Sequence, residues 1–182
     1  MNESELVLNC LKGKRDSQKQ LYERYAPKMF AVCYRYADSR EDAEDFLQEA
    51  FITVFRKLNQ WKGEGELGAW IRRIVVNTSL NGVKAKHKMT EVNSELTAED
   101  LPDYATGFLF HEGKELLELI HHLPPGYRMV FNLHVIEGFS HEEIAVMLGV
   151  KPGTSRSQFL RARKLLIGKL TGNEKKLSSQ NG

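Results

Sequence analysis

The chain has 182 residues, of which 41% are hydrophobic and 27% charged, a balance typical of one ordinary domain or two small ones and unlike that of a disordered chain. No apolar run approaches the ~18 residues that a membrane helix requires, and the acidic start, Met1–Glu5, lacks the basic and apolar segments of a secretory signal. Cys10 and Cys33 are too few for a disulfide framework, so we expect both to be reduced packing residues. These features predict a cytoplasmic protein without membrane insertion.

The net charge of +2 conceals an uneven distribution, with +4 on residues 1–90, −7 on residues 91–118 and +5 on residues 119–182. Two basic blocks separated by an acidic segment are typical of two modules that meet a polyanion, joined by a segment that does not. The domains expected are an N-terminal helical domain at 1–90, a flexible acidic linker at 91–111, a C-terminal domain at 112–172 and a disordered tail at 173–182.

The first block has the apolar periodicity of helices. Residues 43–58 hold one apolar stripe at intervals of three and four residues over four turns, which is hard to reconcile with a strand. Asp38 or Ser39 can cap this helix, and acidic residues crowd its first turn, where the helix dipole favours carboxylates.

Helices are also expected on both sides of this one. A stripe over residues 21–36 predicts a preceding helix, which Pro27 is expected to kink or restart. A polar loop at 59–65 contains Trp61 and leads into a further helix at 67–86. A bundle of three or four helices can enclose one core of this size.

The second block is helical as well. Its pattern predicts helices at 116–123 and 127–136, separated by a Pro-Pro-Gly break, and a helix-turn-helix over 139–170. The expected fold is therefore all-α, with two small helical domains joined by the acidic linker and a helix-turn-helix in the C-terminal one.

Local signals define the helix-turn-helix. Ser140 and Glu143 form a capping box, Gly149 can take the positive φ of the turn, and Pro152 can start the second helix. Ser155 occupies a position where such motifs usually bury Val or Ile, so either the helix crossing is looser or this serine faces DNA.

The second helix of this motif suits a DNA major groove. Short side chains near its start allow close approach, Arg and Gln can contact base edges, and later Arg and Lys can neutralise phosphates. The alternative is an ordinary helical hairpin with a solvated basic face. The candidate DNA-contacting residues are Thr154, Ser155, Arg156, Ser157, Gln158, Arg161, Arg163 and Lys164.

Taken together, the two blocks resemble the extracytoplasmic-function (ECF) sigma factors, two-domain specificity subunits of bacterial RNA polymerase. The first matching segment is similar to the family's core-binding signature and the second to its promoter-melting helix. The matching segments are 42–51 (DAEDFLQEAF), 68–77 (GAWIRRIVVN), 123–128 with 137–145 (LPPGYR, EGFSHEEIA) and 153–157 with 161–165 (GTSRS, RARKL).

The resemblance implies a role in binding core RNA polymerase for the polar side of the 43–58 helix. Asp45, Gln48 and Glu49 would bind the coiled coil of the largest polymerase subunit, and Phe46 and Leu47 would help to place them. The alternative is that these acids only stabilise the start of their helix.

The resemblance also implies that the helix at 67–86 faces the minus-ten promoter element and that the loop at 59–66 accepts a base flipped from the non-template strand. Trp61 either stacks on that base or caps the domain core, and Trp70 is expected in the core. The residues implied in minus-ten contact are Trp61, Arg72, Arg73, Asn77, Lys84 and Lys86.

The second domain would read the minus-thirty-five element through Thr154, Arg156, Ser157 and Gln158. A glutamine at 158, where the family often has Arg or Lys, favours a target that contains adenine. The family implies promoter DNA and core polymerase as partners, allows an anti-sigma factor, and implies no cofactor and no catalysis.

Two other classes of protein share some of these features. The histidines at 111, 121, 122, 134 and 141 could indicate a metal enzyme. However, the sequence contains no His-Glu-x-x-His motif, phosphate loop or nucleophile motif, so no metal site is expected. A free-standing helix-turn-helix regulator explains residues 112–170 equally well, but gives no purpose to the polar face around Asp45 or to the basic helix at 67–86.

Overall fold

The computed structural model describes residues 2–88 and 114–178. Over these residues the chain is helical and contains no strand, which confirms the predicted all-α class. The chain divides into two compact units, residues 1–90 and 91–182, which are considered one at a time. The expected acidic linker at 91–111 lies outside the described residues. None of the described helices is both long and apolar enough to cross a membrane.

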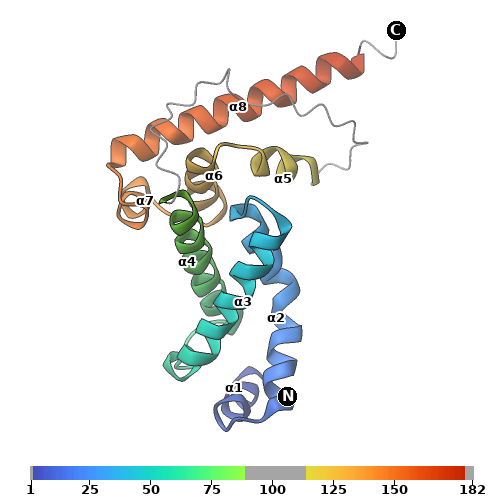
Figure 1. The fold of residues 1–182 in the computed structure, drawn as a ribbon, viewed down its shortest axis with the longest axis vertical. Helices are drawn as coiled ribbons and strands as arrows, with labels where there is room; N and C mark the ends of the chain where they lie inside the picture. The colour runs from blue at the N-terminus through green and yellow to red at the C-terminus, as the bar shows by residue number, and fades with distance from the viewer. Residues whose placement is uncertain (1, 89–113, 179–182) are drawn as a thin grey trace. The chain divides into compact units, whose positions relative to one another are not determined.

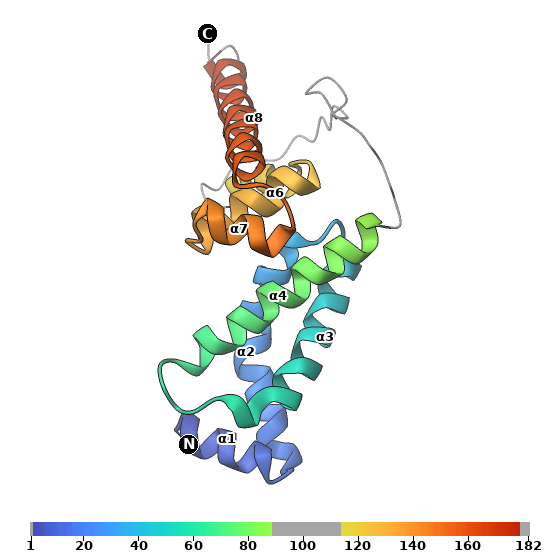
Figure 2. The same ribbon diagram turned by 90° about the vertical axis from the view of Figure 1, so that its left-hand side faces the viewer.

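Three long helices of the first unit pack against one another, and a short one lies at their end (Figures 1 and 2). α3 contacts both α2 and α4, so its apolar side is enclosed between them. The elements are α1 (Glu3–Leu11), α2 (Arg15–Tyr36), α3 (Arg40–Lys57), η1 (Leu58–Gln60) and α4 (Leu67–Lys88).

The stripe predicted over residues 43–58 forms the centre of this core. Ser39 caps α3, because its side chain accepts a hydrogen bond of 3.1 Å from the backbone N–H of Asp42. Phe46 and Phe55 lie half-buried at the edges of the stripe. Each fully buried Leu, Val or Phe stabilises the fold by roughly 1.5–3 kcal/mol. The buried members are Ala43, Leu47, Ala50, Phe51, Val54 and Leu58.

Pro27 was expected either to kink or to restart its helix, and the restart does not occur. α2 runs without interruption from Arg15 to Tyr36. A proline inside a helix costs about 3 kcal/mol through a lost hydrogen bond and a clash. Buried residues on both sides of Pro27, such as Leu21 and Val32, offset that cost because they pack on the same core.

A carboxylate from the first helix anchors the start of α4. Glu3 accepts a 2.5 Å hydrogen bond from the Tyr25 hydroxyl through Oε1 and a 3.4 Å bond from the Leu67 N–H through Oε2. Burial and, next in size, the hydrogen bond to Glu3 together raise the pKa of Tyr25 to about 12. An N–H of the first helical turn has no partner within its own helix, so Glu3 joins α1, α2 and α4 at one point.

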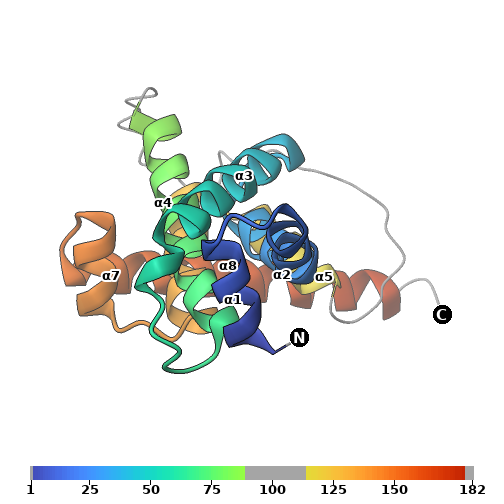
Figure 3. The ribbon, with the colours of Figure 1, turned by 90° about the horizontal axis from the view of Figure 1, so that it is seen from below.

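The second unit packs three short helical elements against one long helix. α6 and α7 both contact α8, and α8 extends well beyond them (Figures 1 and 3). The core of the α5–α8 contact consists of Ile120, Leu123, Ala162 and Leu166. The elements are α5 (Lys114–His121), α6 (Pro125–Phe131), the π-helical segment η3 (Asn132–Ile136), α7 (His141–Leu148) and α8 (Pro152–Ser178).

The helix-turn-helix signals are confirmed. Ser140 and Glu143 form both hydrogen bonds of a capping box, and Gly149 ends α7 in the left-handed conformation with φ 70°. α8 continues to Ser178, within the tail predicted at 173–182, and the last four residues of that tail lie outside the described part of the chain. No proline interrupts this stretch, and an existing helix gains one hydrogen bond with each residue that it adds.

The contact between α3 and α4 requires a glycine, which gives a test of the core. A Cβ at Gly82 would lie 2.2 Å from Cε1 of Phe46, so Gly82→Ala should force the ring aside and destabilise the first unit by about 1–3 kcal/mol. Both tryptophans lie in this unit, so urea unfolding followed by tryptophan fluorescence reports it selectively.

Two control variants sharpen this test. Asn81 is exposed on the same helix, so Asn81→Ala should leave the free energy of unfolding almost unchanged. Phe46→Leu together with Gly82→Ala should recover part of the loss. Equal stability of Gly82→Ala and the wild type would contradict the close approach.

Candidate polymerase and nucleic-acid interfaces

The polar side chains predicted for polymerase binding share the outer side of α3. Asp45, Gln48 and Glu49 are exposed, because the side of the helix that carries the apolar stripe is turned to the core. Leu47 is buried and Phe46 lies against Gly82 of α4. These two residues therefore anchor the helix, and the three polar ones form a surface that a partner can reach.

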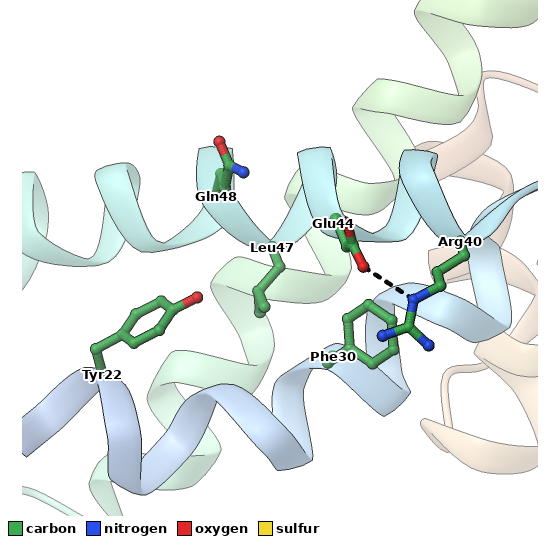
Figure 4. Close-up of a pocket in the computed structure, with 6 residues that line it drawn as sticks. All are labelled: Tyr22, Phe30, Arg40, Glu44, Leu47 and Gln48. Atoms are coloured by element: carbon green, nitrogen blue, oxygen red, sulfur yellow. Dashed lines mark hydrogen bonds and ion pairs between the residues drawn. The ribbon is translucent and has the colours of Figure 1, made fainter.

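A shallow groove lies beside this surface, between α2 and α3. Its volume is about 320 Å³, and Figure 4 shows the rings of Tyr22 and Phe30 on α2 facing Leu47 of α3. The Arg40 Nε donates a 2.9 Å hydrogen bond to Glu44, and its guanidinium lies 5.3 Å from the centroid of the Phe30 ring. The residues that line the groove are Tyr22, Phe30, Arg40, Glu44, Leu47 and Gln48.

Tyr22 and Phe30 are candidate interface residues that sequence reasoning missed. Both lie outside the apolar stripe of α2, and Tyr22 remains 39% exposed. An aromatic side chain that lies off the stripe of an amphipathic helix is the signal that was available to find them.

The structure divides the residues predicted for minus-ten contact between two sides of α4. Arg73, Asn77 and Lys84 fall on one side at the helical spacing, opposite the buried residues, with Arg73 and Asn77 exposed and Lys84 half-buried. Arg72 is half-buried on another side. Lys86 is bound by carboxylates of the first unit: its Nζ lies 2.5 Å from Asp42 and 3.9 Å from Asp38.

Trp61 lies where the loop leaves η1. The residue is half-buried, and its indole Nε1 is covered without an acceptor among the described residues. The following residues up to Glu66 are all exposed, and Gly63 and Gly65 have φ of 79° and 76°. The loop thus presents an exposed backbone next to a partly open aromatic ring.

The residues predicted for minus-thirty-five contact are exposed along α8 with two exceptions. Gln158 is half-buried, and its Nε2 would lie 3.2 Å from a Cβ at Gly126. Ser155 is fully buried and its Oγ lies 2.9 Å from Nδ1 of His141. The exposed members are Thr154, Arg156, Ser157, Arg161, Arg163 and Lys164.

The prediction that Ser155 contacts DNA is therefore wrong. Its hydroxyl points into the crossing of α7 and α8, where it is covered by His141 and offers no atom to a groove. Of the two alternatives for this position, the one in which the serine faces DNA is wrong, because the side chain is buried.

Two of the exposed arginines have partners within the unit. The guanidinium of Arg156 binds the carboxylate of Glu142 on α7, and both side chains are exposed. The Nη1 of Arg161 lies 3.4 Å from the Tyr127 hydroxyl, to which it donates. By helical spacing Thr154 and Arg161 lie on one side of α8 and Arg156 on another, so the predicted set spans more than one face.

The histidine clusters form no metal site in the part of the chain that is described. Across residues 2–88 and 114–178, no three His, Cys, Asp or Glu side chains come together as ligands. The rings of His121 and His122 lie edge to face with centroids 5.8 Å apart. His111 lies outside the described residues.

Both units of the chain match known protein families. Residues 21–89 match the sigma-70 region 2 family, and residues 113–166 match the sigma-70 region 4 family. The ECF RNA polymerase sigma-E factor of Haemophilus influenzae is 30% identical, with 93% of this chain and 96% of the relative covered. The sigma-E factor of Escherichia coli K12 is 31% identical, with 91% and 92% covered.

A solved structure has a similar fold. It is the sigma factor RpoE of Bartonella quintana, crystallised with the anti-sigma factor NepR, at a TM-score of 0.51 and 21% identity over 84% of this chain and 96% of that one. The sequence relatives show the family. The chain belongs to the ECF sigma factors of RNA polymerase, proteins that direct the polymerase to promoters.

The ion pair between Asp42 and Lys86 makes the stability of the first unit depend on pH. Partial burial opposes ionisation of Asp42, but hydrogen bonds from Lys86 and Ser39 outweigh it and hold the pKa of this carboxyl below its ordinary value. A lowered carboxyl pKa contributes stability that is present above the unfolded value of about 3.9 and is lost as the pH falls through the folded pKa.

We therefore expect Asp42→Asn to lower the unfolding temperature of the first unit at about pH 7, with a difference from the wild type that shrinks toward about pH 3. Tryptophan fluorescence follows the transition. Glu41→Gln, at an exposed neighbour in the same helical turn, is the matched control. A difference of the same size at both pH values would show that Asp42 does not act through its charge.

Proposed function

We propose that the exposed polar side of α3 is the surface that binds core RNA polymerase, and that Asp45, Gln48 and Glu49 make its central contacts. The observation that carries the proposal is their exposure on one side of a helix whose other side is the domain core. Polar residues held on a rigid helix keep their geometry when a partner docks, which favours a specific interface.

The outer side of α4 is the minus-ten surface in this proposal. Arg73, Asn77 and Lys84 share it, and their donors can contact phosphates and base edges. The exposed loop at 62–66 and the half-buried ring of Trp61 lie at the start of α4, where a flipped base can stack at a gain of roughly 1–3 kcal/mol. Lys86 lies on another side of α4, where Asp42 binds its ammonium group, so a DNA contact from Lys86 is separate from this surface.

The exposed side chains of α8 form the minus-thirty-five surface. Arg156 and Ser157 in its first turns are placed to contact bases, and Arg163 and Lys164 further along are placed to contact phosphates. Each neutralised phosphate should weaken binding by up to about 0.9 log units per log unit of salt.

In this proposal the protein is a cytoplasmic initiation factor that performs no catalysis, since the polymerase carries out the chemistry. An anti-sigma factor is a further proposed partner, in keeping with the NepR-bound RpoE of similar fold. The second candidate function is a free-standing helix-turn-helix regulator, which α7 and α8 support on their own. It predicts DNA binding without affinity for polymerase.

Reconstitution with core polymerase tests the proposed function. The wild type should form a holoenzyme that starts transcription from a promoter found by mapping transcript starts after overexpression. Asp45→Arg should abolish holoenzyme formation and Gln48→Ala should weaken it, with the helical content unchanged, because the side chains are exposed. Asp16→Arg, a charge reversal at an exposed position on α2, should bind normally. Full holoenzyme formation by both α3 variants would contradict the assignment.

Promoter selection tests the role of α8. Arg156→Ala should cost roughly 1–3 kcal/mol at one base pair of the minus-thirty-five element and relax the preference there. Arg163→Ala should weaken binding evenly over all sequences, because phosphate contacts carry no sequence information. If Arg156→Ala also weakens all sequences evenly, Arg156 anchors a phosphate.

A further inference from the structure

Two half-buried histidines lie at the start of the helix-turn-helix. His134 belongs to η3 and His141 is the first residue of α7, and their rings stack with centroids 4.2 Å apart. The Phe159 ring of α8 lies edge-on to His134 at 4.9 Å. Three elements of the second unit therefore meet in one cluster of rings, directly behind the start of α8.

Polar contacts run through this cluster. His134 donates from Nδ1 to the backbone carbonyl of Phe139 at 2.8 Å, since a carbonyl oxygen can only accept. His141 Nδ1 and the Ser155 Oγ lie 2.9 Å apart, and Ser155 is 0% exposed. This last contact joins the first turn of α7 to the first turn of α8, at the position where such motifs usually bury an apolar side chain.

The surroundings of His141 favour its neutral form. Burial lowers its pKa, and the neighbouring His134 of η3 and Arg156 of α8 lower it further, while Glu142 of α7 opposes them. A neutral imidazole nitrogen pairs with a buried hydroxyl without bringing a charge into the stack of rings.

We propose that the hydrogen bond between His141 and Ser155 positions the first turn of α8 for reading the minus-thirty-five element, an inference that rests on the proposed role of α8. Ser155 directly precedes Arg156 and Ser157, so its side chain sets the rotation of that turn about the helix axis. Apolar packing has no preferred direction, whereas a hydrogen bond weakens steeply when its angle changes. The polar contact therefore fixes an orientation that a Val in the same place would leave to packing.

A double-mutant cycle with the full chain in holoenzyme tests the inference. His141→Phe removes the partner of the buried Ser155 hydroxyl, Ser155→Ala removes the partner of the half-buried His141 ring, and the double variant removes both. The measured quantity is the ratio of transcription from a promoter with its minus-thirty-five element intact to that from the same promoter with the element scrambled. His122→Gln, at an exposed histidine of the same unit, is the control.

Each single variant should lower this ratio about fivefold or more, because the hydrogen bond that orients the first turn of α8 is lost. The double variant also lacks this bond, so it should fall about as far as the lower single variant and not by the product of the two single losses. Ser155→Ala removes one oxygen atom, so it decides the result if His141→Phe does not fold, as judged by circular dichroism.

A pH profile adds a readout that mere filling of space would not change. The folded pKa of His141 lies below its unfolded value of about 6.5, so its contribution to stability is present above that pH and is lost as the pH falls through the folded pKa. Urea unfolding followed by circular dichroism, with tryptophan fluorescence reporting the first unit separately, should show this loss for the wild type and a smaller one for the double variant.

The possible outcomes separate the two proposals. Single variants that keep the wild-type ratio overturn the positioning role alone. A double variant that returns to the wild-type ratio, or that falls by the product of the two single losses, overturns it as well, as does an identical pH profile for wild type and double variant. A wild-type holoenzyme that ignores the scrambled element overturns the proposed role of α8, and the positioning role with it.

Discussion

Burial of one apolar stripe along α3 determines what the first unit can present to a partner. Because the stripe is enclosed between α2 and α4, the opposite side of the same helix is left exposed with Asp45, Gln48 and Glu49 on it. Phe46 at the edge of the stripe sits on Gly82, which sets how closely α4 approaches. The position of the outer side of α4, with Arg73 and Asn77, follows from the same packing.

Two cations that could contact DNA are held by carboxylates of their own unit. Lys86 binds Asp42, and Arg156 binds Glu142. Exposed ion pairs contribute only about 0–1 kcal/mol, so a phosphate or a base edge can take the place of the carboxylate at little cost. The pairs keep the side chains ordered near the surfaces where they are proposed to act.

The elements that depend on neighbours along the chain could be predicted from the sequence. The capping box at Ser140 and the left-handed turn at Gly149 are local signals, and both occur as expected. The roles of Pro27 and Ser155 could not be read in the same way, because helix α2 is held together by packing on both sides of the proline and Ser155 is covered by His141, which is distant in sequence. The groove at Tyr22 and Phe30 forms only when two helices meet.

The sequence by itself determined the all-α class, the helix-turn-helix and the family, since periodicity, caps and motifs are written in consecutive residues. Only the tertiary structure decided which of the predicted contact residues are covered or paired. The partial burial of Gln158, the pairing of Lys86 and the burial of Ser155 depend on which helices pack against them, and that packing is a property of contacts between residues far apart in the chain.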